Sequence, residues 1–246
     1  MLSKGQIKLI KSLHNKKFRK GTRMFIAEGK KLVEEIADSP IKVLHIWATG
    51  RYTGPLQHNQ ITEDELAQVS ALTTPQGIIA LCEIPESAGP LPNLDNEWAI
   101  ALDDIRDPGN LGTVIRIADW FGISHIFCSE ESVEVYNPKT VQATMGSIAR
   151  VNVHYVDLGE ILLKYKSENV PIYGATLEGN DVYATTFSQN GILVIGNEAN
   201  GISERVERSV THNIRIPSFA KNKGPESLNA AVATAVICAE LRRQGK

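Results

Sequence analysis

The stretch WAIALDDIRDPGNLGTVIRIADWFGISHIFC, residues 98–128, decides the fold of the larger part of this chain. It opens with an apolar run at 98–102 that is typical of a buried strand, and a polar loop follows. Helical periodicity then extends over 111–121, and a further apolar run lies at 125–128. A strand, a helix and a strand in this order predict two parallel strands joined by a crossover helix.

The same alternation continues to the end of the chain and predicts an α/β domain with a mostly parallel, six-stranded sheet covered on both faces. Ligands of such sheets bind outside the carboxyl ends of the strands, so the loops that follow strands are the candidate sites. The expected strands are 98–102, 125–128, 151–156, 172–175, 192–196 and 213–217. The expected helices are 111–121, 138–145, 158–166, 203–210 and a last one from Ser227.

The first part of the chain has its own pattern of elements. Ser3 and Gln6 form a possible capping box, and Thr62 with Glu65 forms another. A segment rich in Pro, Gly and acids without periodicity, ESAGPLPNLDNE at 86–97, is typical of an exposed linker. We therefore expect a small domain over 1–88, a linker over 89–97 and a second domain over 98–246. In the small domain, helices are expected at 30–37 and from Thr62 to about Leu72, and strands at 43–47 and 77–84.

Composition excludes several protein classes. With 246 residues, of which 42% are hydrophobic and 22% charged, the chain is typical of ordinary globular proteins. Its three cysteines form no C-x-x-C pair, its six histidines are scattered, and its apolar runs are too short for a bilayer span of about 20 residues. We expect a cytoplasmic protein with neither a metal site nor a membrane span.

Charge is distributed unevenly along the chain. Residues 1–31 carry ten Lys or Arg and a single acid, Glu28, whereas the whole chain has a net charge of −2. Such a cluster can neutralise several phosphates of a nucleic acid. A solvated helix face and a mitochondrial presequence are alternative interpretations of the same residues. The candidate RNA-binding residues are Lys4, Lys8, Lys16, Lys17, Arg19 and Arg23.

Two common nucleotide-binding motifs do not account for the polar loops. The chain contains no G-x-G-x-x-G run, which weakens a dinucleotide-binding interpretation. GNEANGIS at 196–203 has the spacing of a phosphate-binding loop, but Ile202 stands where the lysine is required. Three polar loops at strand ends remain: 103–116, 195–201 and 214–233.

Together these loops resemble the SpoU, or TrmH-like, branch of the SPOUT RNA methyltransferases. Loop 103–116 matches the D-P-x-N-x-G-x-x-x-R element, loop 195–201 resembles G-N-E-x-x-G, and loop 214–233 resembles I-P followed by S-L-N. All three occur in the family's order. The N-terminal stretches FIAEGKKLVEEI and TTPQGIIALCE also resemble the small substrate-binding domain of many members, which is similar in fold to ribosomal protein L30e. The matching residues of the three elements are Asp107, Pro108, Asn110, Gly112, Arg116, Gly196, Asn197, Glu198, Gly201, Ile216, Pro217, Ser227, Leu228 and Asn229.

The resemblance implies an enzyme that transfers a methyl group from S-adenosyl-L-methionine to a ribose 2'-hydroxyl of ribosomal or transfer RNA. It also implies a homodimer and a deep trefoil knot near the C-terminus, an exception to the rule that chains do not thread loops. The implied catalytic residues are Asn110, Arg116, Glu198, Ser227 and Asn229. The implied cofactor-binding residues are Thr176, Leu177, Gly196, Asn197, Gly201, Ile216, Pro217 and Leu228.

Elementary chemistry limits the roles of these side chains. Methyl transfer to a ribose oxygen needs alignment of the oxygen and removal of its proton. Arg116 is a poor base on pKa grounds, so we favour a phosphate clamp that assists deprotonation, with a surface arginine as the alternative. Asn110 is either a site residue or an ordinary N-cap, and Glu198 either orients Arg116 or the ribose or is a solvated turn acid.

The last motif leaves similar alternatives open. Ser227 is a candidate helix cap, and Asn229 is expected one residue inside the last helix, where its poor helix propensity favours a specific hydrogen bond. Gln142 and Thr144 depart from the family pattern, as does the long basic loop FAKNKGPE at 219–226. Two other functions remain possible at this point: a non-catalytic RNA-binding or ribosome-assembly protein, and a methyltransferase acting on a base.

Overall fold

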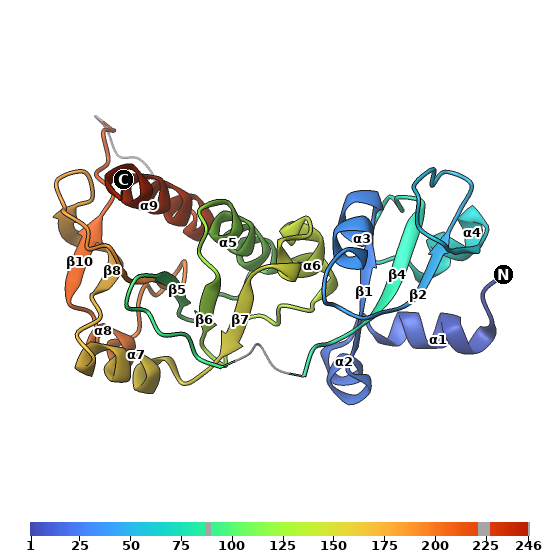
Figure 1. Ribbon diagram of the computed structural model, residues 1–246, viewed down its shortest axis with the longest axis horizontal. Helices are drawn as coiled ribbons and strands as arrows, with labels where there is room; N and C mark the ends of the chain where they lie inside the picture. The colour runs from blue at the N-terminus through green and yellow to red at the C-terminus, as the bar shows by residue number, and fades with distance from the viewer. Residues whose placement is uncertain (87–89, 221–226, 246) are drawn as a thin grey trace. The chain divides into compact units, whose positions relative to one another are not determined.

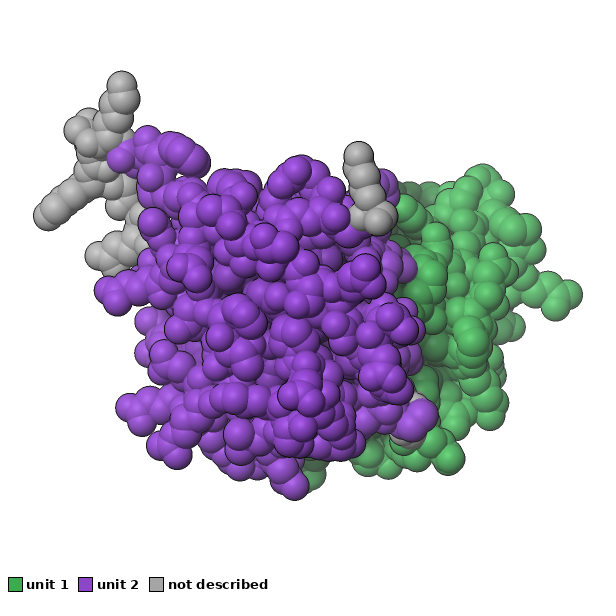
Figure 2. All heavy atoms as spheres, turned by 60° about the vertical axis from the view of Figure 1, so that its left-hand side comes forward, with its two compact units in different colours: residues 1–88, 134–150 green, residues 89–133, 151–246 purple. Residues whose placement is uncertain are grey.

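The computed structural model describes residues 1–86, 90–220 and 227–245. The chain forms two compact units, Met1–Ala88 with Glu134–Arg150 and Gly89–Val133 with Val151–Lys246, here called unit 1 and unit 2 (Figures 1 and 2). Residues 221–226 of the basic loop lie outside the described ranges, as do residues 87–89, the last of which begins the expected linker. In the described part of the chain, no helix is both long and apolar enough to cross a membrane.

Unit 2 contains the six-stranded sheet that the alternating pattern predicts. The strands lie in the order β10-β8-β9-β5-β6-β7, and every neighbouring pair is parallel. The prediction of six strands is confirmed. The ends of five strands agree within two residues, and β8 extends six residues further than expected. The strands are β5 (Trp98–Leu102), β6 (His125–Cys128), β7 (Asn152–Tyr155), β8 (Ile172–Asp181), β9 (Gly191–Ile195) and β10 (His212–Arg215).

Helices cover both faces of this sheet. α5 (Pro108–Trp120) and α9 (Ala230–Gln244) pack together on one face, and α7 (Leu158–Ser167) and α8 (Glu204–Glu207) lie on the other (Figure 1). β5 and β9 are buried at every position, as expected for strands covered on both faces. On the α7 side, Leu162 and Tyr165 pack against the strand residues Phe127 and Ile172. This core fixes the strand ends from which the polar loops emerge.

Unit 1 is built around a four-stranded mixed sheet of order β1-β4-β2-β3. Both predicted capping boxes form, at Ser3 before α1 and at Thr62 before α4. The predicted elements at 30–37, 43–47 and 77–84 are present, whereas α2, β1, β3 and η1 were not predicted. The strands are β1 (Met24–Glu28), β2 (Val43–Ala48), β3 (Asn59–Gln60) and β4 (Ile78–Glu83), and the helices are α1 (Lys4–Ser12), α2 (Lys16–Thr22), α3 (Lys30–Ala37), α4 (Glu63–Val69), α6 (Pro138–Thr144) and the 3₁₀ turn η1 (Ser147–Ala149).

Residues 134–150 group with unit 1 although the expected domain boundary placed them in the second domain. Glu134 accepts a hydrogen bond from the buried guanidinium of Arg19 at 2.7 Å. The rings of Tyr136 and Phe25 lie 4.8 Å apart, and Arg150 bonds Glu35 at 2.5 Å. These contacts join residues more than 100 positions apart in sequence, so local patterns in the sequence do not predict the grouping.

Candidate active site at the strand ends of unit 2

The first polar loop ends at the start of α5. Asp107 is the N-cap, because its Oδ1 accepts a hydrogen bond from the backbone N–H of Asn110 at 2.7 Å, and Pro108 occupies the first helical turn. The helix therefore begins three residues earlier than its apolar periodicity predicted. Asn110 lies inside the first turn and is not the cap, which leaves its side chain available for other partners.

Three predicted site residues meet in one chain of hydrogen bonds. Asn229 donates from Nδ2 to Oδ1 of Asn110 at 2.9 Å, and Asn110 donates from Nδ2 to Oε1 of Glu198 at 2.5 Å. The three residues come from different loops, 88 and 119 positions apart in sequence. We call Asn229, Asn110 and Glu198 the polar triad. It joins the three motif loops at the carboxyl ends of the strands, where ligands of α/β sheets bind.

The start of α9 differs from the prediction. Asn229, and not Ser227, is the N-cap, and its Oδ1 accepts hydrogen bonds from the backbone N–H groups of Ala231 and Val232 at 3.0 and 3.3 Å. Asn229 therefore precedes the helix and does not lie within it. Its Oδ1 and Nδ2 have separate roles, since one caps α9 and the other holds Asn110. Ser227 is exposed next to the described end of the third loop.

The loop at 195–201 closes tightly on itself. The side chain of Asn197 accepts from the N–H groups of Ala199 and Asn200 and donates to the carbonyl of Asp104 at 2.8 Å. Asn197 and Gly201 also exchange two backbone hydrogen bonds of 2.9 Å. A side chain at Gly196 would collide with the backbone of Gly201. The Asn197 side chain thus holds the loop. A contact between Asn197 and the cofactor, as predicted, would therefore use the backbone of Asn197.

Two acids that sequence reasoning did not single out support the same loops. Asp103 is 6% exposed and accepts from the backbone N–H of Ser203 at 2.7 Å. Asp104 has a φ of 56°, a left-handed conformation that is uncommon outside glycine, and its N–H donates to Ser129 at 2.9 Å. The only signal in the sequence was their position, directly after the buried strand β5.

The predicted cofactor-binding residues lie on three segments around the strand ends. Thr176 and Leu177 were expected in a loop but lie within β8, in a bulge, because the pairing with β10 jumps from Gly174 to Asn180. The Thr176 hydroxyl donates to the carbonyl of Glu178 at 2.8 Å, which keeps the bulge compact. Gly196, Asn197 and Gly201 lie in the tight loop after β9. In the third motif loop, Ile216 and Pro217 follow β10 and are half-buried, and Leu228 is exposed before α9.

The residues present fit S-adenosylmethionine. Adenosine is a flat ligand that needs apolar cover and nearby backbone donors and acceptors. The Leu177 side chain is 70% exposed and that of Leu228 is 47% exposed. Leu177 lies in the bulge of β8, and Leu228 lies directly before Asn229, the N-cap of α9. They would cover the adenosine, while the backbone next to Gly196 and Ile216 would supply its hydrogen bonds.

Arg116 lies outside the polar triad. It follows Asn110 and Thr113 at three-residue spacing along α5, and the side chains of Thr113 and Arg116 are exposed. Glu198 bonds Asn110, so the structure does not bear out the interpretation in which Glu198 orients Arg116. Among the described residues, none makes a hydrogen bond or an ion pair with the Arg116 guanidinium. That guanidinium is therefore available to an anion from outside the chain.

The structure corrects one of the predicted RNA-binding residues. Arg19 is only 1% exposed, and its guanidinium donates to the carbonyl of Leu13 and to Glu134, both at 2.7 Å. It anchors α2 and does not reach a phosphate, because its position on the helix points into unit 1. Arg23 ends α2 and binds the carbonyl of Ile84 at 3.2 Å. The other members of the group, Lys4, Lys8, Lys16 and Lys17, are exposed.

Comparisons with known proteins agree with this architecture. A model of the SpoU rRNA Methylase family matches residues 97–239, and a model of the MRM3-like substrate binding domain matches residues 4–80. The protein of Bacillus subtilis named 23S rRNA (guanosine(2553)-2'-O)-methyltransferase RlmP is 32% identical over 244 residues, which cover 96% of each chain.

Solved structures extend the likeness to the whole chain. A TrmH-family protein from Porphyromonas gingivalis is 35% identical, with a TM-score of 0.86 and 99% of each chain covered. An rRNA methyltransferase from Sinorhizobium meliloti, solved with AdoMet bound, is 30% identical, with a TM-score of 0.84, and the match covers 99% of this chain and 96% of that one.

A parallel α/β unit with three polar loops at its strand ends, joined in one chain to a small unit with basic helices, defines a class of RNA-modifying transferases. The chain belongs to the SpoU (TrmH-like) family of RNA 2'-O-methyltransferases, with an N-terminal substrate-binding domain of the MRM3-like kind.

Proposed function

We propose that this chain methylates a ribose 2'-hydroxyl of ribosomal RNA. The family gives the reaction class, which is ribose 2'-O-methylation with S-adenosylmethionine. The choice of ribosomal RNA rests on the Bacillus subtilis relative, whose name specifies a guanosine of 23S rRNA. The observation that carries the proposal is the polar triad, because it joins all three family motifs in one hydrogen-bonded arrangement.

The residues of the chain divide the work of the reaction. S-adenosylmethionine supplies a methyl group on a sulfonium, so that the new O–C bond forms as the S–C bond breaks. Asn110 and Glu198 are hydrogen-bonded to each other, which holds two of the motif loops together, and they would orient the ribose hydroxyl for transfer. Arg116 binds the RNA phosphate next to the ribose and keeps it close to the hydroxyl. The hydroxyl proton passes to this phosphate and from there to solvent.

An Arg116→Ala variant tests this division of roles. We expect transfer of labelled methyl groups to ribosomal RNA to fall by about a hundredfold or more, because deprotonation loses its support. Calorimetric titration should give unchanged affinities for S-adenosylmethionine and its demethylated product, since Arg116 does not hold the cofactor. Thr113→Ala, one turn away on the same exposed side of α5, is the control and should keep full activity. Full activity in Arg116→Ala would remove Arg116 from the catalytic residues.

We also propose that the active form is a homodimer joined through α5 and α9. Trp120 on α5 is 84% exposed and Val232 on α9 is 50% exposed, although both helices pack against each other in the same layer. Large apolar side chains exposed on one face are typical of protein–protein contacts. A second copy of the chain on this face would cover them and would bring its own α5 close to the neighbouring site.

A further inference from the structure

A phenylalanine on α2 lies open to solvent in a basic setting. The side chain of Phe18 is 49% exposed. Its neighbours one turn along the helix are small: Gly21 at i+3 and Thr22 at i+4. A Cβ atom at Gly21 would find no atom within 4 Å, and the Thr22 hydroxyl turns inward to donate to the carbonyl of Phe18 at 2.8 Å. Neither of these two neighbours places a large side chain beside the ring.

The direction in which Phe18 leaves α2 follows from its neighbour in sequence. Arg19 is buried and is held by the carbonyl of Leu13 and by Glu134 at 2.7 Å each. Successive residues of a helix point about 100° apart. With Arg19 anchored inside unit 1, Phe18 is directed towards solvent. The ring is thus presented at the surface of unit 1, where a ligand can reach it.

Lysines without ion-pair partners lie close to Phe18 in the sequence of α2, and others lie along α1. No lysine of α1 or α2 forms an ion pair with another described residue. Lys4, Lys8 and Lys11 follow the i, i+4, i+7 spacing of one helical stripe, and Ile10 on the other side of α1 is buried. On α2 the exposed lysines are Lys16, Lys17 and Lys20.

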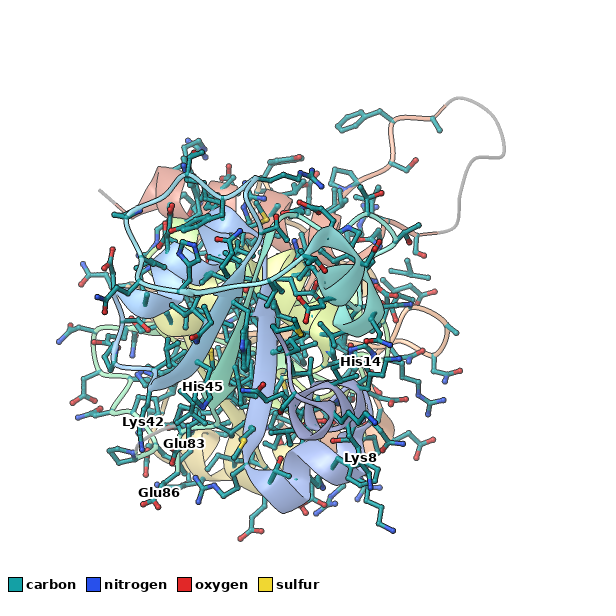
Figure 3. All side chains as sticks on the ribbon, turned by 90° about the vertical axis from the view of Figure 1, so that its right-hand side faces the viewer. Lys8, His14, Lys42, His45, Glu83 and Glu86 are labelled. Carbon is teal, nitrogen blue, oxygen red and sulfur yellow. The ribbon has the colours of Figure 1, made fainter. Side chains whose placement is uncertain are left out.

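Another flank of unit 1 is different, because acids there neutralise the cations. Lys42 pairs with Glu83 at 2.9 Å, and Arg23 lies 3.7 Å from Glu86. Figure 3 shows Lys42, Glu83 and Glu86 together on one flank and Lys8 apart from them on the other. α1 and α2 together carry six exposed lysines without an ion pair to a described residue, and Phe18 lies on α2 among them.

We propose that Phe18 is a stacking site for one unpaired base of the RNA substrate, with the lysines of α1 and α2 holding the flanking phosphates. This rests on the proposed function, which makes the ligand an RNA. An exposed aromatic ring among cations suits a nucleotide because every base has a π face and every linkage has a phosphate. A base inside a duplex is already stacked, so the site selects an unpaired nucleotide in a loop, bulge or single strand.

Binding to two RNA probes tests the site. The probes are a fluorescent oligouridylate of about 12 nucleotides and a blunt RNA duplex of similar length, both titrated with the full chain without S-adenosylmethionine. We expect Phe18→Ala to weaken binding of the oligouridylate about tenfold and binding of the duplex less than twofold. Phe18→Tyr should bind as the wild type does. Phe18→Leu should lose as much as Phe18→Ala, because leucine keeps the apolar surface but has no π face.

Two controls separate stacking from other effects. Tyr183→Ala removes another aromatic side chain that is 49% exposed, outside the basic segment, and should leave both affinities unchanged. Lys17→Ala should weaken both probes alike and reduce the slope of log affinity against log salt by about one. Equal losses on both probes in Phe18→Ala, full binding by Phe18→Leu, or no binding of the oligouridylate by the wild type would each overturn the proposal.

The outcome is independent of catalysis. Methyl transfer by the wild type to ribosomal RNA is measured separately from these titrations. Absent transfer with Phe18-dependent binding would contradict the proposed function alone. Active transfer with binding that does not depend on Phe18 would contradict the stacking site alone.

Discussion

Asn110 connects two partners through a single amide. Its Oδ1 accepts from Asn229 at 2.9 Å, and its Nδ2 donates to Glu198 at 2.5 Å. The carboxamide of asparagine offers a donor and an acceptor on one planar group without a change of protonation state. The carboxylate of Glu198 needs a donor, and the N-cap Asn229 offers one, so Asn110 is matched to both neighbours. Its identity therefore matters for the geometry of the site more than for the stability of α5.

Replacement of Asn110 by aspartate should introduce a pH dependence. In Asn110→Asp, a second carboxylate faces Glu198, and mutual repulsion raises the pKa of one of the two above its usual range. We expect kcat to fall by about a hundredfold at pH 8 and to recover partly towards pH 5.5, where one carboxyl is protonated and can donate. Asn110→Ala should show the loss without the recovery. Methyl transfer measured across this pH range, relative to the wild type, gives the result.

Thermal unfolding controls for a simple structural defect in both variants. The backbone N–H of Asn110, which Asp107 caps, is unaffected by either substitution. The melting temperature should therefore stay close to that of the wild type. Equal pH profiles for Asn110→Asp and Asn110→Ala would show that the contact with Glu198 does not position the site.

At the level of elements, the sequence predicted strands better than the ends of helices. All six strands of the parallel sheet were expected, because each is a short apolar run between polar loops. The starts of α5 and α9 were misplaced by three residues, since the capping residues Asp107 and Asn229 are decided by side-chain hydrogen bonds and not by periodicity. α2 was missed because KKFRKGT has no apolar stripe, and tertiary contacts of Arg19 hold it in place.

The neighbouring strands β6 and β7 carry a pair of histidines that ties the stability of unit 2 to pH. His125 Nδ1 and His154 Nε2 lie 3.1 Å apart, and the two rings are stacked with centroids 5.4 Å apart. Burial lowers the pKa of both imidazoles, and the nearby charge of His125 lowers the pKa of His154 further, whereas Glu97 acts in the opposite direction on His125. A hydrogen bond between the rings requires at least one neutral nitrogen as acceptor.

We expect the melting temperature to fall as the pH decreases from 7 to 5. In the folded chain, the pKa values of His125 and His154 lie below the unfolded value near 6.5. Below pH 6.5 these two imidazoles therefore bind more protons in the unfolded chain than in the folded chain. The full contribution to stability is present above pH 6.5. Below it, each proton bound only in the unfolded chain lowers the free energy of unfolding by at most about 1.4 kcal/mol per pH unit. His154→Phe, next to Phe127, should give a shallower fall, and His58→Gln at an exposed position should match the wild type. An unchanged slope in His154→Phe would exclude the pair as its source.

For the whole molecule, long-range contacts decide what the sequence could not show. The polar triad and the Arg19–Glu134 ion pair join residues separated by 88 to 119 positions. The motifs named Asn110, Glu198 and Asn229 as candidate site residues, and the structure brings these three together, but their mutual hydrogen bonds were not predicted. Arg19 was assigned to the RNA surface because charge alone does not distinguish a buried arginine from an exposed one. The buried guanidinium of Arg19 pairs with Glu134, which belongs to the segment 134–150 that groups with unit 1.

The exposed face of α5 and α9 gives a prediction about assembly. If a second copy covers Trp120, the wild type should have twice the mass of the 27.0 kDa chain in light scattering after size-exclusion chromatography. Trp120→Glu should shift the mass towards a single chain, because a buried carboxylate without a partner is costly at an apolar contact. The substitution should spare the fold, since Trp120 is 84% exposed within one copy. Leu163→Glu, at a position 52% exposed on α7 on the opposite face of the sheet, should leave the mass unchanged. A monomeric wild type, or a Trp120→Glu variant that keeps the double mass, would refute dimerisation through this face.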